Sequence, residues 1–225
     1  MKLGKVVAFS ILFEAGIVFG QQSVTFPLPD RIAQIQADVY GRGEQAVILA
    51  HGGRFNKESW KKQAEILANS GFVVLAIRFR GDRVNPDGSP SAEGSTEDNA
   101  ADILAAVSYL HRIGVESISA VGASLGGDAV GEANVRSAPG TLARVVFLGS
   151  AGGDEPEKLT GRKLFVVARE DRNGSRLPGI EAHYAKAREP KKLVILEGTA
   201  HAQVLFETTE GPRLLNEIVS FLKEP

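Results

Sequence analysis

The stretch that decides the fold is SISAVGASLGGD, residues 117–128. Its first half is an apolar run typical of a buried strand, and its second half contains the pattern G-x-S-x-G, in which Gly122 and Gly126 flank Ser124. Small residues at these two positions permit a sharp turn from strand to helix, which leaves the serine hydroxyl exposed. The following N–H, that of Leu125, then lies at a helix N-terminus, where it can donate to a developing oxyanion. The stretch therefore predicts a nucleophilic serine at the end of a strand.

A phosphate-binding loop is the main alternative for these glycines. Residues 122–127 have the length of a Walker loop, but Asp128 stands where that loop requires a lysine, and its carboxylate repels phosphate. The segment Gly41-Arg42-Gly43 precedes a strand instead of following one, which is typical of a turn. We therefore expect no nucleotide.

The rest of the chain alternates short apolar runs with segments of helical periodicity. The apolar runs are AVILA (46–50), FVVLAIRF (72–79), SISAVGA (117–123), ARVVFLG (143–149), KLFVVA (163–168) and KKLVILEG (191–198). Such runs are typical of strands buried on both faces of a parallel sheet. Segments 23–28 and 31–40 alternate apolar and polar residues and fit half-exposed antiparallel strands at one edge. The pattern predicts an α/β fold, a mostly parallel sheet with helices on both faces.

Helical periodicity is clear in three segments. Apolar residues share one face over 60–67, over 100–110 and over 214–222. Ser95 with Asp98 forms a capping box before the second helix, and Gly114 follows it as a stop signal.

Polar residues follow several of the apolar runs. His51-Gly52-Gly53-Arg54 follows the first run, Ser124 the third, Asp171 the fifth and His201 the sixth. Because ligands bind beyond the carboxyl ends of parallel strands, we expect these residues at one edge of the sheet. The backbone N–H of Gly53 or Arg54 is the expected second oxyanion donor, with His51 itself structural.

These motifs carry a family resemblance. With G-x-S-x-G at Ser124, His51-Gly52-Gly53, and the chain order Ser, Asp, His, the chain resembles a compact α/β-hydrolase of the dienelactone-hydrolase-like kind over roughly residues 23–223. The resemblance implies the α/β-hydrolase fold with a sheet of about eight strands, a Ser-His-Asp triad and no cofactor. Dienelactone hydrolases carry cysteine where this chain has Ser124, and the difference favours ordinary carboxyl esters as substrates.

His201 follows a strand and precedes the last helix. The family that the chain resembles has its general base at this place, so the resemblance implies that His201 is the base. Its role is to take the proton of Ser124 during attack and to return it to the leaving alcohol. His111, within a predicted helix, and His183, in a polar segment, are weaker candidates for this role.

Three carboxylates are candidates for orienting the base. Asp171 ends the motif ARED after the strand that precedes the one leading to His201, and it is the first choice. Glu170 is adjacent to it, and Asp154 follows the preceding strand, a position that some hydrolases of this fold use. Any of them could accept the Nδ1–H of the histidine and stabilise the imidazolium.

The connections between strands limit the size of the site. Only residues 150–162 separate two of the strands where many lipases insert a helical cap, so we expect no large cap domain. The long connection 81–98, rich in Gly, Pro and Ser, lies on the same side, and the site is expected to be open and suited to short acyl esters. Arg54, Arg80 and Arg83 are interpreted as solvated loop residues rather than contacts to an anionic substrate.

Composition bounds the remaining possibilities. The 225 residues fit one domain, here 21–225, and a net charge of −1 gives no electrostatic reason to expect a nucleic-acid partner. The chain has no cysteine, which excludes disulfides and thiolate chemistry, and we expect no bound metal. Residues 1–20 resemble a signal peptide, with Lys2 and Lys5 before a short apolar run. The expected location is periplasmic or secreted if this segment is a signal and cytoplasmic otherwise, with no permanent membrane anchor.

The sequence thus predicts a serine hydrolase that cleaves short-acyl, soluble carboxyl esters through an acyl-enzyme on Ser124. A peptidase or an acyltransferase could use the same residues, and a non-catalytic binding module could share the fold. The expected partner is a small-molecule ester, and the sequence assigns no oligomeric state.

Overall fold

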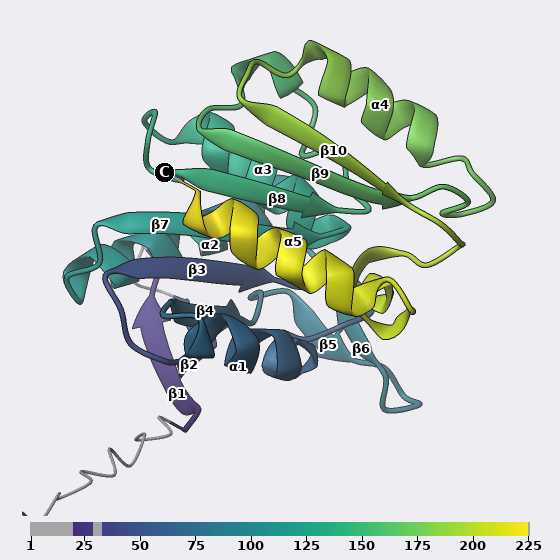
Figure 1. The fold of residues 1–225 in the computed structure, drawn as a ribbon. Helices are drawn as coiled ribbons and strands as arrows, with labels where there is room; N and C mark the ends of the chain where they lie inside the picture. Colours follow the sequence, from purple (N-terminus) through teal and green to yellow (C-terminus); the bar gives the residue numbers. More distant parts are fainter. Residues whose placement is uncertain (1–19, 29–32, 225) are drawn as a thin grey trace, which may run out of the picture.

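An eight-stranded sheet forms the centre of the protein in the computed structural model, which describes residues 20–28 and 33–224 (Figure 1). The strands lie in the order β1-β2-β4-β3-β7-β8-β9-β10. All neighbours from β4 to β10 are parallel, whereas β2 is antiparallel to β4 and β1 is antiparallel to β2. The strand bounds are β1 (Gln22–Pro27), β2 (Gln34–Tyr40), β3 (Gln45–Ala50), β4 (Val73–Ile77), β7 (Ser117–Ala123), β8 (Arg144–Leu148), β9 (Arg162–Ala168) and β10 (Lys191–Leu196). The mostly parallel sheet with an antiparallel edge is therefore confirmed.

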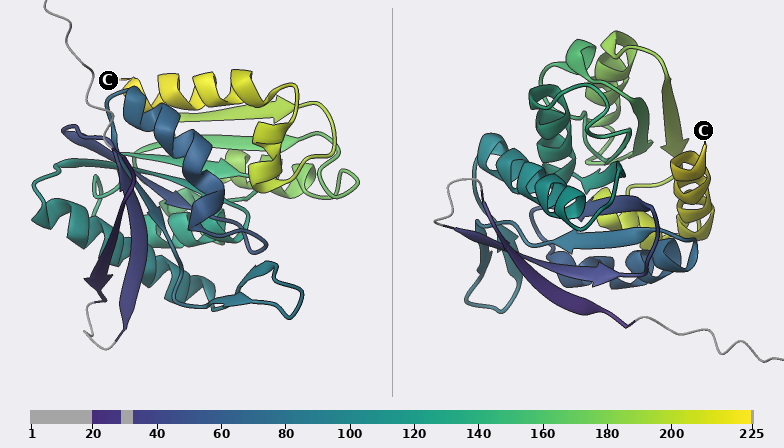
Figure 2. Two further views of the ribbon diagram at one scale, coloured as in Figure 1. Left: turned by 90° about the horizontal axis from the view of Figure 1, so that it is seen from below. Right: turned by 90° about the vertical axis from the view of Figure 1, so that its left-hand side faces the viewer.

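Helices cover both faces of the sheet, as predicted. The α-helices are α1 (Lys61–Asn69), α2 (Thr96–Arg112), α3 (Leu125–Arg136), α4 (Leu177–Lys186) and α5 (Gly211–Lys223), and the short 3-10 helices are η1 (Lys57–Trp60), η2 (Pro156–Lys158) and η3 (Ala202–Glu207). Helices α2, α3 and α4 pack into one apolar core and α1 and α5 into another, on the opposite side of the sheet. The view from below in Figure 2 shows α1 and α5 together on one side and α2 on the other.

The central strands owe their place to their apolar sequences. Every residue of β4 and β8 is buried, and β3, β7 and β9 each have only their first residue partly or fully exposed. The predicted capping box is present, since Ser95 Oγ accepts from Asp98 N at 3.1 Å, and Gly114 ends helix α2 with a φ of +90°. Local signals thus set the ends of this helix as the sequence predicts.

Strand β10 departs from the prediction. The segment KKLVILEG reads as a strand buried on both faces, but β10 is the last strand of the sheet and five of its six residues are partly or fully exposed. Composition cannot distinguish an edge strand from a central one when its side chains are apolar on both faces. The consequence is an apolar strand with one open side.

Of the connections that follow the carboxyl ends of the strands, one agrees with the prediction and one differs from it. Between β8 and β9, residues 149–161 contain only η2, so the absence of a cap domain at this point is confirmed. The connection 81–98, for which the sequence predicts no strand, contains a small antiparallel hairpin of β5 (Asp82–Val84) and β6 (Pro90–Ala92). A turn closed by Gly88 N donating to Asn85 O joins the two strands. Helix α4 also occupies a segment that the sequence suggests is merely polar.

Residues 1–19 of the predicted signal peptide 1–20 lie outside the described residues. Among the residues that the structure describes, no helix combines the length and the apolarity that a membrane span requires.

Candidate active site

Ser124 occupies a strained corner between β7 and α3. Its backbone has φ +49° and ψ −117°, in a region that residues other than glycine rarely adopt. A Cβ on Gly122 would lie 2.3 Å from the carbonyl oxygen of Gly126, and one on Gly126 would lie 2.4 Å from that of Ala50. Both glycines are thus required for the close approach of helix and strands, as G-x-S-x-G predicts. Gly127 N and Asp128 N donate to Ser124 O, which starts the helix immediately after the serine.

A chain of hydrogen bonds joins Ser124, His201 and Asp171. The Oγ of Ser124 lies 2.9 Å from His201 Nε2, and His201 Nδ1 lies 2.8 Å from Asp171 Oδ2. A carboxylate only accepts hydrogen bonds, so we assign the ring proton to Nδ1, which leaves Nε2 to accept from the serine hydroxyl. The geometry provides a serine next to a base that is itself oriented by an acid.

Of the three predicted carboxylates, the structure brings only Asp171 to His201. Asp171 is fully buried in a turn after β9, where Asp171 N donates to Ala168 O. Its second oxygen, Oδ1, has no hydrogen-bond partner among the described residues. Glu170 and Asp154 are both exposed, and Asp154 lines a separate cavity. Asp171 is therefore placed to act on the histidine rather than to stabilise the fold through a network of its own.

The residues predicted as oxyanion donors line the cavity at Ser124. Leu125, the first residue of α3, and Gly53 and Arg54, in the loop after β3, line one cavity together with Ser124. In that loop Gly52 N donates to the side chain of Gln203 and Phe55 N to Gly52 O. No hydrogen bond from the N–H of Gly53 or of Arg54 is found within residues 20–28 and 33–224.

Two side chains, Gln203 and Asp82, hold the loop of residues 51–55, and neither was singled out from the sequence as a site residue. Gln203, which is 5% exposed, accepts from Gly52 N at 2.7 Å and donates to Ser59 Oγ at 2.5 Å. Because Gln203 follows His201 by two residues, it connects the segment that carries His201 to the loop of residues 51–55. No sequence signal marks it, since its partners lie far away along the chain.

Asp82 acts through His51, for which the sequence predicts a structural role. His51 is fully buried, with Nε2 3.0 Å from Asp82 Oδ2 and Nδ1 3.0 Å from Gly52 O. Asp82 belongs to β5, and Ala92 N of β6 donates to Gly53 O at 2.8 Å. The β5–β6 hairpin thus holds the loop of residues 51–55, called the HGG loop below, through His51 and through the carbonyl of Gly53. The position of the hairpin therefore influences the orientation of the Gly53 backbone.

Solved structures with the same architecture are numerous. A dienelactone hydrolase from Anabaena variabilis is 18% identical over 91% of this chain and 95% of its own, with a TM-score of 0.68. An esterase from Pyrococcus furiosus is 14% identical over 91% of this chain and 92% of its own, with a TM-score of 0.72. A cold-adapted esterase from an Arctic intertidal metagenomic library is 15% identical over 96% of this chain and 100% of its own, with a TM-score of 0.73.

The chain has the α/β-hydrolase fold. No protein-family model matches the sequence, and no curated protein matches it either. The structural neighbours include a dienelactone hydrolase and several esterases, as the resemblance of the motifs suggested, and at these identities they establish the fold.

The cavity at Ser124 is small. Its volume is about 290 Å³, and its walls come from the HGG loop, the start of α3, the turn after β9 and η3. The lining residues are Gly52, Gly53, Arg54, Phe55, Ser124, Leu125, Arg172, His201, Ala202 and Val204. The side chain of His201 is 25% exposed, so solvent reaches the base.

The arginines near the site have different surroundings. Arg80 Nε donates to buried Asp102 at 2.6 Å, which commits it to the protein, and Arg83 lines a different cavity beside the β5–β6 hairpin. Arg54 and Arg172 are exposed at the rim of the Ser124 cavity. Among the described residues, no cluster of three or more His, Asp or Glu side chains is placed to hold a metal ion.

Proposed function

We propose that this protein is a serine hydrolase that cleaves carboxyl esters of short acyl chains through an acyl-enzyme on Ser124. The observation that carries the proposal is the hydrogen-bonded chain from Ser124 Oγ through the His201 ring to buried Asp171. The esterases among the structural neighbours support the same chemistry by analogy.

Acylation begins when Ser124 Oγ attacks the ester carbonyl and His201 Nε2 takes the hydroxyl proton. The imidazolium formed is stabilised by Asp171, whose carboxylate accepts the Nδ1–H. Negative charge on the former carbonyl oxygen is met by the N–H of Leu125 and by that of Gly53 or Arg54. As the tetrahedral intermediate collapses, Nε2 returns the proton to the leaving alcohol and the acyl group stays on Ser124.

Deacylation repeats these steps with water. His201 Nε2 removes a proton from a water molecule as its oxygen attacks the acyl carbon, and the same N–H groups stabilise the second oxyanion. Collapse releases the carboxylic acid and restores the serine hydroxyl. The partial exposure of His201 gives water a direct path to this position.

The dimensions of the site favour short acyl groups. A cavity of about 290 Å³ is at the lower end of the range for small-molecule sites, and residues 149–161 add no cap above it. The apolar side chains of Phe55, Leu125 and Val204 line the cavity and suit a few methylene groups.

The test uses Ser124→Ala in the full chain with a panel of p-nitrophenyl esters that vary in acyl length and charge. We expect turnover of the shortest esters by the wild type and its loss in Ser124→Ala, with an unchanged circular dichroism spectrum. A fluorophosphonate probe should label the wild type and leave Ser124→Ala unlabelled. Turnover that survives in the variant would overturn the proposal.

The same panel addresses the other activities that this arrangement could support. Folded wild-type protein that neither turns over esters nor accepts the probe would identify a binding module instead. Release of p-nitrophenol that accelerates with an added alcohol or amine, and yields the transferred product, would identify an acyltransferase. Cleavage of amide substrates in preference to esters would identify a peptidase.

A further inference from the structure

His51, directly after β3, has a hydrogen-bond acceptor at each of its two ring nitrogens. Nδ1 lies 3.0 Å from Gly52 O, and Nε2 lies 3.0 Å from Asp82 Oδ2. A carbonyl oxygen only accepts hydrogen bonds, and so does an ionised carboxylate. A neutral imidazole has one N–H, whereas these two contacts need two. The pair of His51 and Asp82 therefore needs one proton more than a neutral histidine and a carboxylate carry between them.

We assign this additional proton to the ring rather than to the carboxyl group. Imidazole is by nature a stronger base than carboxylate. Arg78 Nε lies 3.9 Å from Asp82 Oδ2, and its positive charge favours the ionised carboxylate. Glu58 and Arg83, which line the same small cavity as Asp82, carry opposite charges and offset each other. The charges around the pair thus suit an imidazolium that faces a carboxylate.

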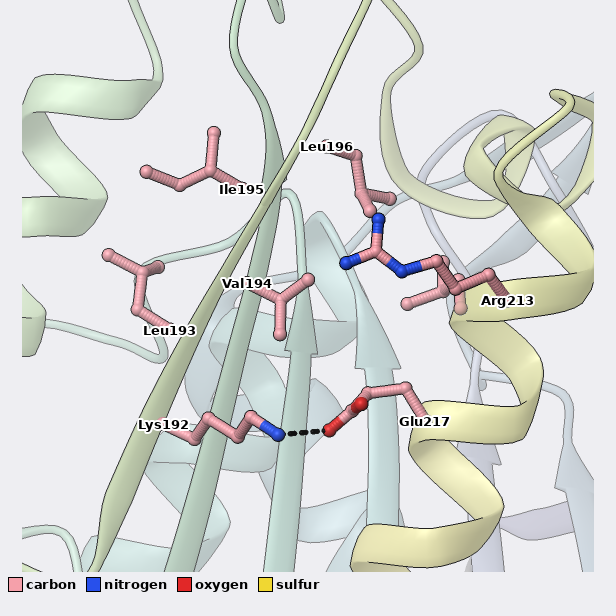
Figure 3. Close-up of a pocket in the computed structure, with 8 residues that line it drawn as sticks. Lys192, Leu193, Val194, Ile195, Leu196, Arg213 and Glu217 are labelled. Atoms are coloured by element: carbon pink, nitrogen blue, oxygen red, sulfur yellow. Dashed lines mark hydrogen bonds and ion pairs between the residues drawn. The ribbon is translucent and has the colours of Figure 1, made fainter.

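Burial separates this pair from water. As a contrast, Lys192 and Glu217 form an ion pair in the groove between β10 and α5 (Figure 3), with side chains 50% and 32% exposed, so water can replace either partner. The side chains of His51 and Asp82 are only 0% and 6% exposed. The Phe79 ring packs against the imidazole with centroids 5.0 Å apart. If the ring loses its proton, a nitrogen lone pair is left facing an oxygen where water has little access.

The contact at Nδ1 controls the direction of a predicted oxyanion donor. Gly52 O and Gly53 N belong to one peptide group, which is planar and trans, so the N–H points opposite to the C=O. The carbonyl is held by the His51 ring, and it also accepts from Phe55 N at 3.0 Å. Gly53 itself lines the cavity at Ser124. The grip on Gly52 O therefore fixes the direction of the Gly53 N–H at this cavity.

We propose that His51 is a positioning residue held as an imidazolium, and that loss of its proton turns the Gly53 N–H away from the oxyanion. A ring with a single proton keeps it on Nε2, because a hydrogen bond to a carboxylate is roughly twice as strong as one to a neutral carbonyl. Nδ1 then presents a lone pair to Gly52 O, and the peptide group rotates to relieve the repulsion. The catalytic consequence rests on the proposed ester hydrolysis, whereas the protonation of His51 does not.

NMR of the histidine ring nitrogens tests the protonation of His51 without an assay of activity. The chain has four histidines, so single substitutions of His111, His183 and His201 by Gln identify the His51 signals by exclusion. In the wild type at neutral pH we expect both ring nitrogens of His51 to carry a proton. In Asp82→Asn the amide can donate to Nε2, so we expect a neutral ring with its proton on Nδ1. A neutral His51 ring in the wild type at neutral pH would overturn the proposal.

The kinetic test follows kcat for a short alkyl ester from neutral to alkaline pH. We expect the wild-type kcat to fall by about a hundredfold as the His51 ring loses its proton, the usual cost of one missing oxyanion donor. Asp82→Asn should show no such fall, because its neutral ring already holds Gly52 O. Asp87→Asn is the matched control, since it removes the same charge from the exposed turn of the same hairpin, and its kcat should fall as in the wild type.

Circular dichroism at each pH marks the limit at which the protein unfolds. A wild-type kcat that stays constant up to that limit would overturn the positioning role of His51. So would an equal fall in Asp82→Asn and the wild type. A wild type that turns over no ester would instead refute the proposed function, and the NMR measurement would still decide the protonation of His51.

Discussion

Replacement of Asp171 by Asn tests the catalytic arrangement most directly. The Asp171 carboxylate accepts from His201 Nδ1 at 2.8 Å, and its other oxygen has no partner among the described residues. An asparagine of the same shape can present its NH₂ group to Nδ1, which moves the ring proton to Nε2. Nε2–H then cannot take the proton of Ser124, whose Oγ lies 2.9 Å away.

The expected loss follows from that change of tautomer. For a buried acid in this role the loss in kcat is about ten-thousandfold, equivalent to about 5 kcal/mol of transition-state stabilisation. The free energy of unfolding should change little, by about 1 kcal/mol or less. The variant loses one charged hydrogen bond but also relieves the burial of a charge, and these two effects have opposite signs.

The assay is the hydrolysis of a short p-nitrophenyl ester, with kcat and KM measured separately and urea unfolding measured alongside. Glu170→Gln and Asp154→Asn are matched controls, because each removes one of the other carboxylates that the sequence proposed for the same role. We expect both to keep kcat within a few-fold of the wild type. If Asp171→Asn keeps nearly full kcat, or if a control loses as much, the assignment of Asp171 is wrong.

Two further predictions concern stability. Gly122→Ala places a Cβ 2.3 Å from Gly126 O, so we expect it to lower the free energy of unfolding in urea by about 1–3 kcal/mol. Gly179 lies within helix α4, and a Cβ added there has no atom within 4 Å, so Gly179→Ala should raise the free energy of unfolding by about 0.5–1 kcal/mol. If the two substitutions changed the free energy of unfolding equally, the packing argument would be refuted. Burial raises the pKa of Asp128 despite the hydrogen bond from Ser150, so its ionised form opposes folding above that pKa. We expect Asp128→Asn to melt at a higher temperature than the wild type at neutral pH. The difference in melting temperature should shrink as the pH falls through the raised pKa of Asp128. Calorimetry at several pH values measures this difference, and a difference that stays constant would contradict the prediction.

Local patterns in the sequence account for much of the fold and for the residues that meet at Ser124. The turn at G-x-S-x-G depends on residues within four positions of one another, so its geometry can be predicted without knowing the rest of the chain. Runs of apolar residues predict the parallel strands, and the carboxyl ends of such strands meet at one edge. That rule alone places Ser124, Asp171 and His201 near each other.

Contacts between distant segments could not be predicted in the same way. The bond from Gly52 to Gln203 and the pairing of His51 with Asp82 depend on loop conformations that no periodic pattern encodes. The choice among Asp171, Glu170 and Asp154 likewise required knowledge of which carboxylate is turned inward. The position of β10 at the edge depends on the order of strands across the sheet, and an apolar sequence is compatible with either place.

The short connection between β8 and β9 also has a kinetic consequence. With nothing inserted between residues 149 and 161 to close over Ser124, bulk solvent stays in contact with the cavity throughout the proposed cycle. Any other nucleophile must then compete for the acyl group against water at its full concentration. Product partitioning therefore depends on how well an acceptor is held at the rim, where Arg54 and Arg172 are the charged side chains available to hold it.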